Sequence, residues 1–130
     1  PQARYTSAQR QAVYARRLAD ARAILTGGDT VVVDATFTDR ATRALFFDMA
    51  RATGNACIVV HCTASPATLE RRVARRQSEG IDPSEATVTV LHQQLAQFEP
   101  PGADEAVVTV ATDESFDVDE LSRAIKADAA

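Results

Sequence analysis

Asp34 is the residue whose surroundings most clearly predict chemistry. It follows Thr30–Val33, an unbroken β-prone run without polar alternation, so the run predicts a strand buried on both faces of a parallel sheet. A carboxylate is costly to bury, but at the end of a parallel strand it faces the crevice where open α/β sheets bind ligands. Asp34 is therefore a candidate functional residue. The alternative is that it only caps a loop or the following helix.

A cluster of arginines further along the chain is the second candidate. Arg71, Arg72, Arg75 and Arg76 share one short segment. The planar guanidinium group matches phosphate oxygens better than the ammonium group of lysine does, so this segment predicts contact with a phosphorylated ligand. The alternative is a solvated helix face with i,i+4 partners, such as Glu79 for Arg75.

Helices must position these side chains, and they are predicted from apolar residues at helical spacing and from capping signals. The helix after Asp82 has a D-x-x-E capping pattern and a proline in its first turn. The expected helices run from Ser7 to about Thr26, from Thr38 or Asp39 to Gly54, from Ser65 to about Gln77, from Asp82 to Phe98, and from Asp117 onward.

Three continuously apolar or β-prone runs are predicted to be strands: Thr30–Val33, Ala56–Cys62 and Ala106–Ala111. The first two enclose a helix and form a βαβ unit, which requires parallel strands. We therefore expect an α/β fold, with a parallel three-stranded sheet and flanking helices, in a single domain over residues 1–130.

Composition limits the classes of function. The chain has 130 residues, 45% hydrophobic and 25% charged, with a net charge of -4, which gives no overall attraction to nucleic acid or membrane. No apolar run approaches the roughly 18 residues of a membrane span. Cys57 and Cys62 should point to opposite faces of one strand and so remain unpaired. A reduced, cytoplasmic location is expected.

Several stretches together resemble one family, the P-loop kinases of the gluconate-kinase, zeta-toxin and polynucleotide-kinase type. The resemblance covers about residues 4–113 and implies the later part of a three-layer P-loop fold that uses ATP and Mg²⁺. Its motifs are the strand ending in Asp34-Ala35-Thr36-Phe37, the helix arginines Arg40 and Arg43, the strand and turn 58–66, and the arginine-rich helix 69–76.

The resemblance implies roles for residues in the first half of the chain. Asp34 matches the acidic residue that helps to hold Mg²⁺, directly or through water, and is a catalytic residue in this interpretation. Thr36 follows it on the substrate side. Arg40 and Arg43 match basic positions that face the phosphoryl acceptor. Because such kinases phosphorylate sugars, antibiotics, nucleotide sugars and nucleic-acid ends on the same scaffold, the resemblance implies either a small-molecule acceptor or a nucleic-acid end.

The second half of the chain carries the residues expected to contact ATP. Arg72, Arg75 and Arg76 match the lid helix that closes over the triphosphate, with Arg72 and Arg76 as catalytic residues and Arg75 as a cofactor contact. Thr112 and Asp113 follow the last strand, where the family's chain passes the adenine. Arginines suit this chemistry because phosphoryl transfer depends on charge neutralisation and positioning.

The sequence departs from the family because it lacks the phosphate-binding loop G-x-x-x-x-G-K-[ST]. Lys126 is the single lysine. The chain begins at Pro1 without a methionine, as expected for a trimmed, processed or excised chain, and we expect it to be a fragment of a P-loop kinase domain. We expect weak ATP binding and no turnover. The missing strand would leave open sheet edges, which a homodimer or an N-terminal segment would fill.

Two alternatives stay open. Asp34-Ala35-Thr36-Phe37-Thr38 also fits the D-x-T-x-T pattern of haloacid-dehalogenase-like phosphatases, in which Asp34 would be the nucleophile. That family also needs a lysine and further acidic residues for Mg²⁺, and Lys126 is the only lysine available. The other alternative is a non-catalytic α/β module that binds a partner through its sheet edge or its arginine helix.

Overall fold

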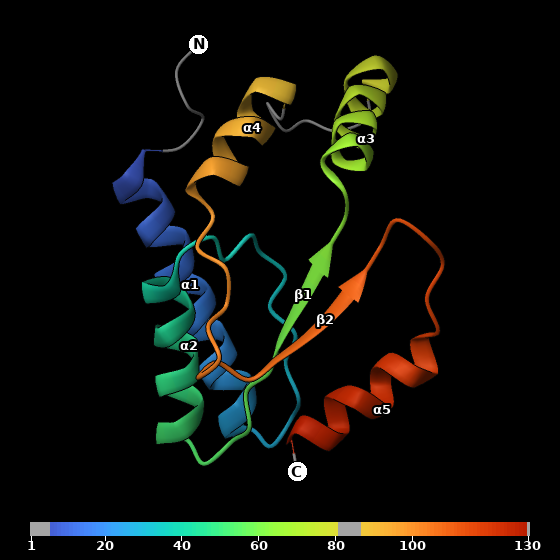
Figure 1. Ribbon diagram of the computed structural model, residues 1–130. Helices are drawn as coiled ribbons and strands as arrows, with labels where there is room; N and C mark the ends of the chain where they lie inside the picture. Colours follow the sequence, from blue (N-terminus) through green and yellow to red (C-terminus); the bar gives the residue numbers. More distant parts are fainter. Residues whose placement is uncertain (1–5, 81–86, 130) are drawn as a thin grey trace. The chain divides into compact units, whose positions relative to one another are not determined.

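A computed structural model describes residues 6–80 and 87–129 of the chain (Figure 1). Its internal contacts divide the chain into two compact units, Pro1–Cys57 and Ile58–Ala130. The expected single domain over residues 1–130 stays a prediction.

The first unit contains two helices that contact each other, α1 (Ser7–Thr26) and α2 (Arg40–Ala52). Thr6 begins α1 with a capping box, in which its side chain accepts from the Gln9 amide and the Gln9 side chain accepts from the Thr6 amide. The Asp39 side chain caps α2 by accepting from the Thr42 amide. Both predicted helices are confirmed.

The core of the first unit lies between these helices and the segment that follows α1. Ala21, Phe46 and Met49 are buried, and partly buried hydrophobic residues pack against them, among them Val31 and Val33. The alternation places Val31 and Val33 toward the helices and leaves Val32 88% exposed. The helices therefore cover only one face of this segment.

The expected strand Thr30–Val33, buried on both faces, is therefore wrong for the described structure. The segment forms no strand, and within residues 6–80 and 87–129 no other strand pairs with it. An apolar run indicates burial, but a strand also needs a neighbour to receive its backbone hydrogen bonds. Without that neighbour, the segment is one row of valines packed on two helices.

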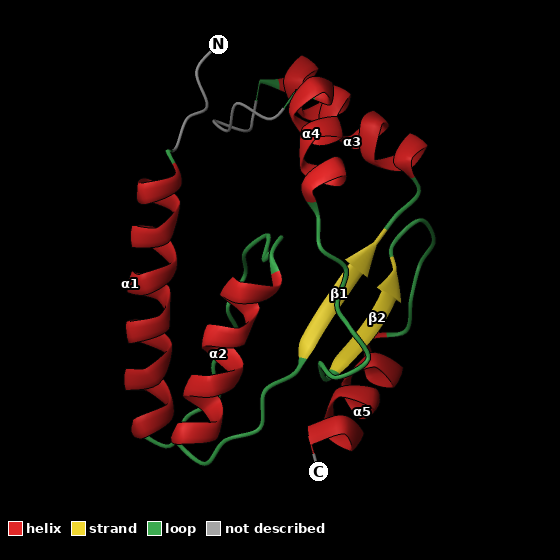
Figure 2. Cartoon of the chain, turned by 60° about the vertical axis from the view of Figure 1, so that its left-hand side comes forward, coloured by secondary structure: helices red, strands yellow, loops and turns green. Residues whose placement is uncertain are grey.

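The second unit holds a parallel pair of strands, β1 (Val59–Thr63) and β2 (Val107–Ala111), drawn in yellow in Figure 2. Val59 pairs with Val107 and Thr63 pairs with Ala111, so the two strands end in register. The crossover between them carries α3 (Pro66–Glu79) and α4 (Val88–Gln97), which contact each other. The last helix, α5 (Val118–Ala129), contacts β2.

The α/β class and the parallel pairing are confirmed, whereas the described residues form a sheet of two strands instead of the expected three. The strand predicted over Ala56–Cys62 begins later, at Val59. Ser65 caps α3 with Pro66 in its first turn, as expected. The predicted capping pattern at Asp82 lies outside the described residues, and Thr87 caps the described helix α4.

Among the described residues, no helix is long and apolar enough to cross a membrane. Cys57 and Cys62 are both free thiols, as their spacing predicted, and burial raises the pKa of the Cys57 thiol. This leaves the expectation of a reduced environment in place as a prediction.

We propose that the backbone of Val31–Val33, which pairs with neither described strand, adds as an edge strand to a second copy of the chain. Exposed strand edges attract other chains, and a lysine on such an edge blocks pairing. Size-exclusion chromatography with light scattering should show a dimer that V32K converts to monomer. The control is V118K, which adds the same charge at a residue 67% exposed on α5. A monomeric wild type, or equal loss of dimer in both variants, would reject the homodimer.

Candidate functional site

The carboxyl ends of β1 and β2 lie at the same edge of the sheet because the strands are parallel and end in register. Beyond the last pair of the ladder, the Thr112 amide donates to the Thr63 carbonyl oxygen at 2.7 Å. The Thr112 hydroxyl donates to the same oxygen at 2.9 Å. These bonds hold the chain after β2 against the end of β1, at the edge where open α/β sheets bind ligands.

Asp113 ties the same loop to the start of α3. Its two carboxylate oxygens lie 2.9 and 3.2 Å from the amide nitrogen of Ser65, which donates to them. Ser65 in turn caps α3 by accepting from the Thr68 amide at 3.3 Å. The bond from the Ser65 backbone, followed by one from the Thr68 side chain, lowers the pKa of the Asp113 carboxyl, and the positive charge of Arg72 adds to this. Asp113 is thus ionised and fixed at the N-terminus of α3.

Arg72 connects α3 to the loop after β2 through two donors of one guanidinium group. Its Nη1 donates to the Thr112 hydroxyl at 2.9 Å, and its Nη2 donates to the Thr112 carbonyl oxygen at 2.5 Å. The structure therefore brings together Arg72, Thr112 and Asp113, which the family resemblance predicts to lie near the nucleotide. Whether they contact a ligand stays a prediction.

A cavity of about 220 Å³ lies between α3 and α4 in the second unit. Arg72 and Arg76 provide the positive charges of this cavity, which we call the arginine cavity, and Gln94 of α4 provides an amide. The remaining lining side chains are apolar: Leu69, Val73 and Leu91. Because pockets for drug-sized ligands have volumes of about 300–1,000 Å³, this cavity suits a phosphoryl group better than a whole nucleotide.

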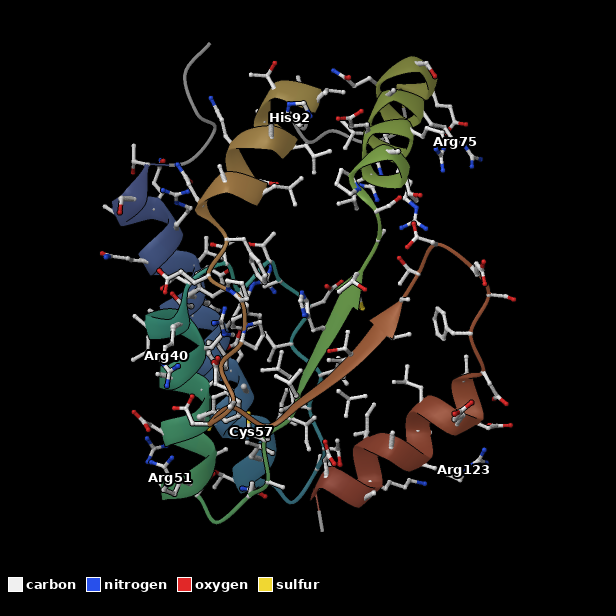
Figure 3. The ribbon with its side chains drawn as sticks, viewed as in Figure 1. Arg40, Arg51, Cys57, Arg75, His92 and Arg123 are labelled. Carbon is white, nitrogen blue, oxygen red and sulfur yellow. The ribbon has the colours of Figure 1, made fainter. Side chains whose placement is uncertain are left out.

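Arg75, labelled on α3 in Figure 3, pairs with a carboxylate of its own helix. Its Nε lies 2.9 Å from Glu79 Oε1, its side chain is 79% exposed, and it does not line the cavity. This is the i,i+4 pair that the sequence offered as the alternative for the cluster. Contact between Arg75 and a cofactor stays a prediction.

A second side-chain contact links the two helices of the crossover. His92 Nε2 on α4 lies 2.7 Å from Glu70 Oε1 on α3.

The first unit holds the other predicted site residues. Asp34 is exposed. Arg40 on α2 is also exposed (Figure 3). The Thr36 hydroxyl lies 3.2 Å from the Tyr14 hydroxyl. Arg43 is only 2% exposed, and its Nη1 donates to the Phe37 carbonyl oxygen at 2.8 Å. Substrate contacts by Thr36, Arg40 and Arg43 stay predictions.

The residues present fit parts of a Mg²⁺-nucleotide. Two guanidinium groups in one cavity match a phosphoryl group. Mg²⁺ is usually held by one or two carboxylates together with substrate phosphates, and Asp34 offers one exposed carboxylate in the first unit. In the part of the chain that the structure describes, no three His, Cys, Asp or Glu residues gather as a metal site of their own.

Sequence reasoning missed two residues that take part in these contacts. Tyr14 lies in α1 and belongs to no motif of the sequence, yet its hydroxyl contacts the Thr36 hydroxyl and the Phe37 amide. Gln94 had no signal that distinguished it from surface residues, yet it lines the arginine cavity. Both contacts join residues far apart in the sequence, so no local pattern could have shown them.

We expect the contact between Asp113 and Ser65 to depend on pH. Folding lowers the pKa of the Asp113 carboxyl, so the ionised carboxylate stabilises the folded state at pH values above the pKa of the unfolded chain. This stabilisation is lost as the pH falls through the pKa of the folded state. NMR titration should give an Asp113 midpoint below that of an unfolded aspartate, with the Ser65 amide shift following it. The D113N variant should abolish the Ser65 response. A midpoint at or above the ordinary value would contradict the assigned contact.

In a comparison with protein families, residues 1–101 of the chain match the AAA domain family. The matched region includes Asp34, Arg72 and Arg76 and ends before Thr112 and Asp113. A comparison with curated proteins gave no match. Because the family match covers most of the 130 residues, the chain belongs to the AAA domain family, a family of P-loop NTPases that includes gluconate-kinase-like proteins and polynucleotide kinase.

Proposed function

We propose that this chain is part of an ATP-dependent phosphotransferase domain that acts on a small-molecule hydroxyl group or a nucleic-acid end. Family membership implies nucleotide binding. The observation that carries the proposal is the position of Arg72, which is fixed to the loop at the ends of the two parallel strands and lines one cavity with Arg76.

Arg72 and Arg76 are suited to bind and neutralise the phosphates of ATP. A guanidinium group carries five N–H donors, and the contacts with Thr112 use two of those of Arg72. The remaining donors are available for phosphate oxygens, while Thr112 keeps the group in one orientation. A guanidinium placed at the transferring phosphoryl group stabilises the negative charge of the transition state, which is the main catalytic requirement of this reaction.

The other proposed contacts follow the predicted roles. Arg75, Thr112 and Asp113 would lie beside the nucleotide. In the first unit, Asp34 would hold Mg²⁺, which when bound neutralises charge on the phosphates. On the acceptor side of the first unit, Thr36 and Arg40 would contact the substrate, whereas the buried Arg43 would act through the Phe37 carbonyl oxygen.

These 130 residues contain no G-x-x-x-x-G-K-[ST] loop, so we expect them to bind Mg²⁺-ATP less tightly than a complete P-loop domain does. That loop surrounds the phosphates with backbone N–H groups and supplies a lysine. The arginine cavity alone should therefore bind Mg²⁺-ATP weakly, without turnover. Membership in a P-loop NTPase family also supports Asp34 as a metal ligand over Asp34 as the nucleophile of a dehalogenase-like phosphatase.

The proposal predicts that R76Q weakens Mg²⁺-ATP binding to this chain by about fivefold, the effect of losing one partly solvated ion pair of about 1 kcal/mol. The affinity is measured by following amide NMR signals of α3 and α4 during a titration with Mg²⁺-ATP. Arg76 is chosen because it lines the cavity, whereas substitution of Arg72 would also break the contact with Thr112.

The matched control is R71Q, which removes the same charge from the same helix at a residue that does not line the cavity. It should change the affinity by less than about twofold. Equal weakening by R71Q and R76Q would show that ATP senses only the overall charge of the helix. No saturable shift in the wild-type chain would favour the non-catalytic module.

A further inference from the structure

Phe37 has an unusual backbone conformation three residues after Asp34. Its φ is +44°, and it is the single non-glycine residue with positive φ among the described residues. A bulky side chain disfavours this region, so such a conformation persists only where the surroundings impose it.

Both backbone polar groups of Phe37 are bound by side chains of the helices in the first unit. Its amide donates to the Tyr14 hydroxyl oxygen at 3.1 Å, and its carbonyl oxygen accepts from Arg43 Nη1 at 2.8 Å. Arg43 is 2% exposed, and a buried guanidinium requires such partners. No buried side-chain nitrogen or oxygen lacks a partner in the described part of the chain.

The ring of Phe37 packs against two other aromatic rings of the first unit. Its centroid lies 5.3 Å from that of Tyr14 and 5.0 Å from that of Phe46, the second pair in an edge-to-face arrangement at 89°. These are favourable aromatic geometries. Tyr14 therefore contacts Phe37 twice, through its ring and through its hydroxyl group.

The same Tyr14 hydroxyl fixes Thr36. It accepts from the Phe37 amide and lies 3.2 Å from the Thr36 hydroxyl. A tyrosine hydroxyl has one proton to donate and oxygen lone pairs to accept with, so it can bind both groups at once. Thr36 and Phe37 are thus tied to α1 directly after Asp34, the residue proposed to hold Mg²⁺.

We propose that Tyr14 and Arg43 are positioning residues that hold the segment Asp34–Phe37 in the conformation in which it meets a Mg²⁺-phosphate ligand. The inference rests on the proposed function. It assigns Arg43 a role through the Phe37 carbonyl instead of the direct substrate contact expected from the sequence. Neither residue takes part in bond making: Tyr14 orients the Thr36 hydroxyl, and Arg43 fixes the peptide that follows it.

The test uses the whole chain, the Y14F variant and Mn²⁺ as the probe for the metal. Y14F keeps the ring and removes only the hydroxyl group. We expect hydrogen exchange at the Phe37 amide to accelerate about tenfold, because its acceptor is gone. Paramagnetic broadening of the Ala35 and Thr36 amides by Mn²⁺, abolished in D34N, should need about threefold more metal in Y14F than in wild type.

The control for stability alone is T53V, which removes a hydroxyl that bonds to the Met49 and Ala50 carbonyl oxygens in the same unit. T53V should leave Phe37 exchange and Mn²⁺ broadening unchanged. For Arg43, R43K keeps a donor and should preserve the Phe37 signal better than R43M.

Two results would overturn the positioning role: Phe37 and Thr36 signals that change no more in Y14F than in T53V, or equal Mn²⁺ affinity in Y14F and wild type. No Mn²⁺ broadening near Asp34 in the wild type would contradict the metal role in the proposed function. In that case Tyr14 and Arg43 would have no metal ligand to position, even if hydrogen exchange at the Phe37 amide is faster in Y14F.

Discussion

The paired hydrogen bonds from the Arg72 guanidinium to Thr112 are the interaction on which the second unit depends. They join α3, which follows β1, to the loop that follows β2. Thr112 also binds the Thr63 carbonyl oxygen, so one residue connects both strand ends and the helix. Because charged donors form stronger hydrogen bonds than neutral ones, this contact holds the arginine helix at the edge where a parallel sheet binds ligands.

In the first unit, too, an arginine on a helix binds the backbone of a loop, and this arginine, Arg43, is more buried than Arg72. Arg43 binds the carbonyl oxygen of Phe37, directly beyond the segment that carries Asp34 and Thr36. A guanidinium group is too costly to bury without such partners, so its burial restricts the conformation of the loop that it binds. In each unit, an arginine on a helix fixes the backbone of a loop that carries predicted site residues, and a second side chain, Thr112 or Tyr14, completes the contact.

Features that depend on neighbouring residues in the sequence were predictable, and those that depend on distant partners were not. Helix starts at Thr6, Asp39 and Ser65 follow from caps within a few residues. The strand expected at Thr30–Val33 failed because an apolar run does not supply a pairing partner. In the site, family resemblance grouped Arg72 with the loop after β2, but no pattern revealed the burial of Arg43, since arginines are rarely buried.

The central claim is that Arg72 and Arg76 present their guanidinium groups to a phosphoryl ligand at the carboxyl edge of the parallel strands. Nitrogen-15 NMR of arginine Nε groups during addition of Mg²⁺-ATP observes these side chains directly. The account predicts saturable shifts at Arg72 and Arg76, and none at Arg16 and Arg51, whose side chains pair with Asp20 and Asp48. Equal shifts at all arginines, or shifts confined to residues outside the cavity, would contradict it.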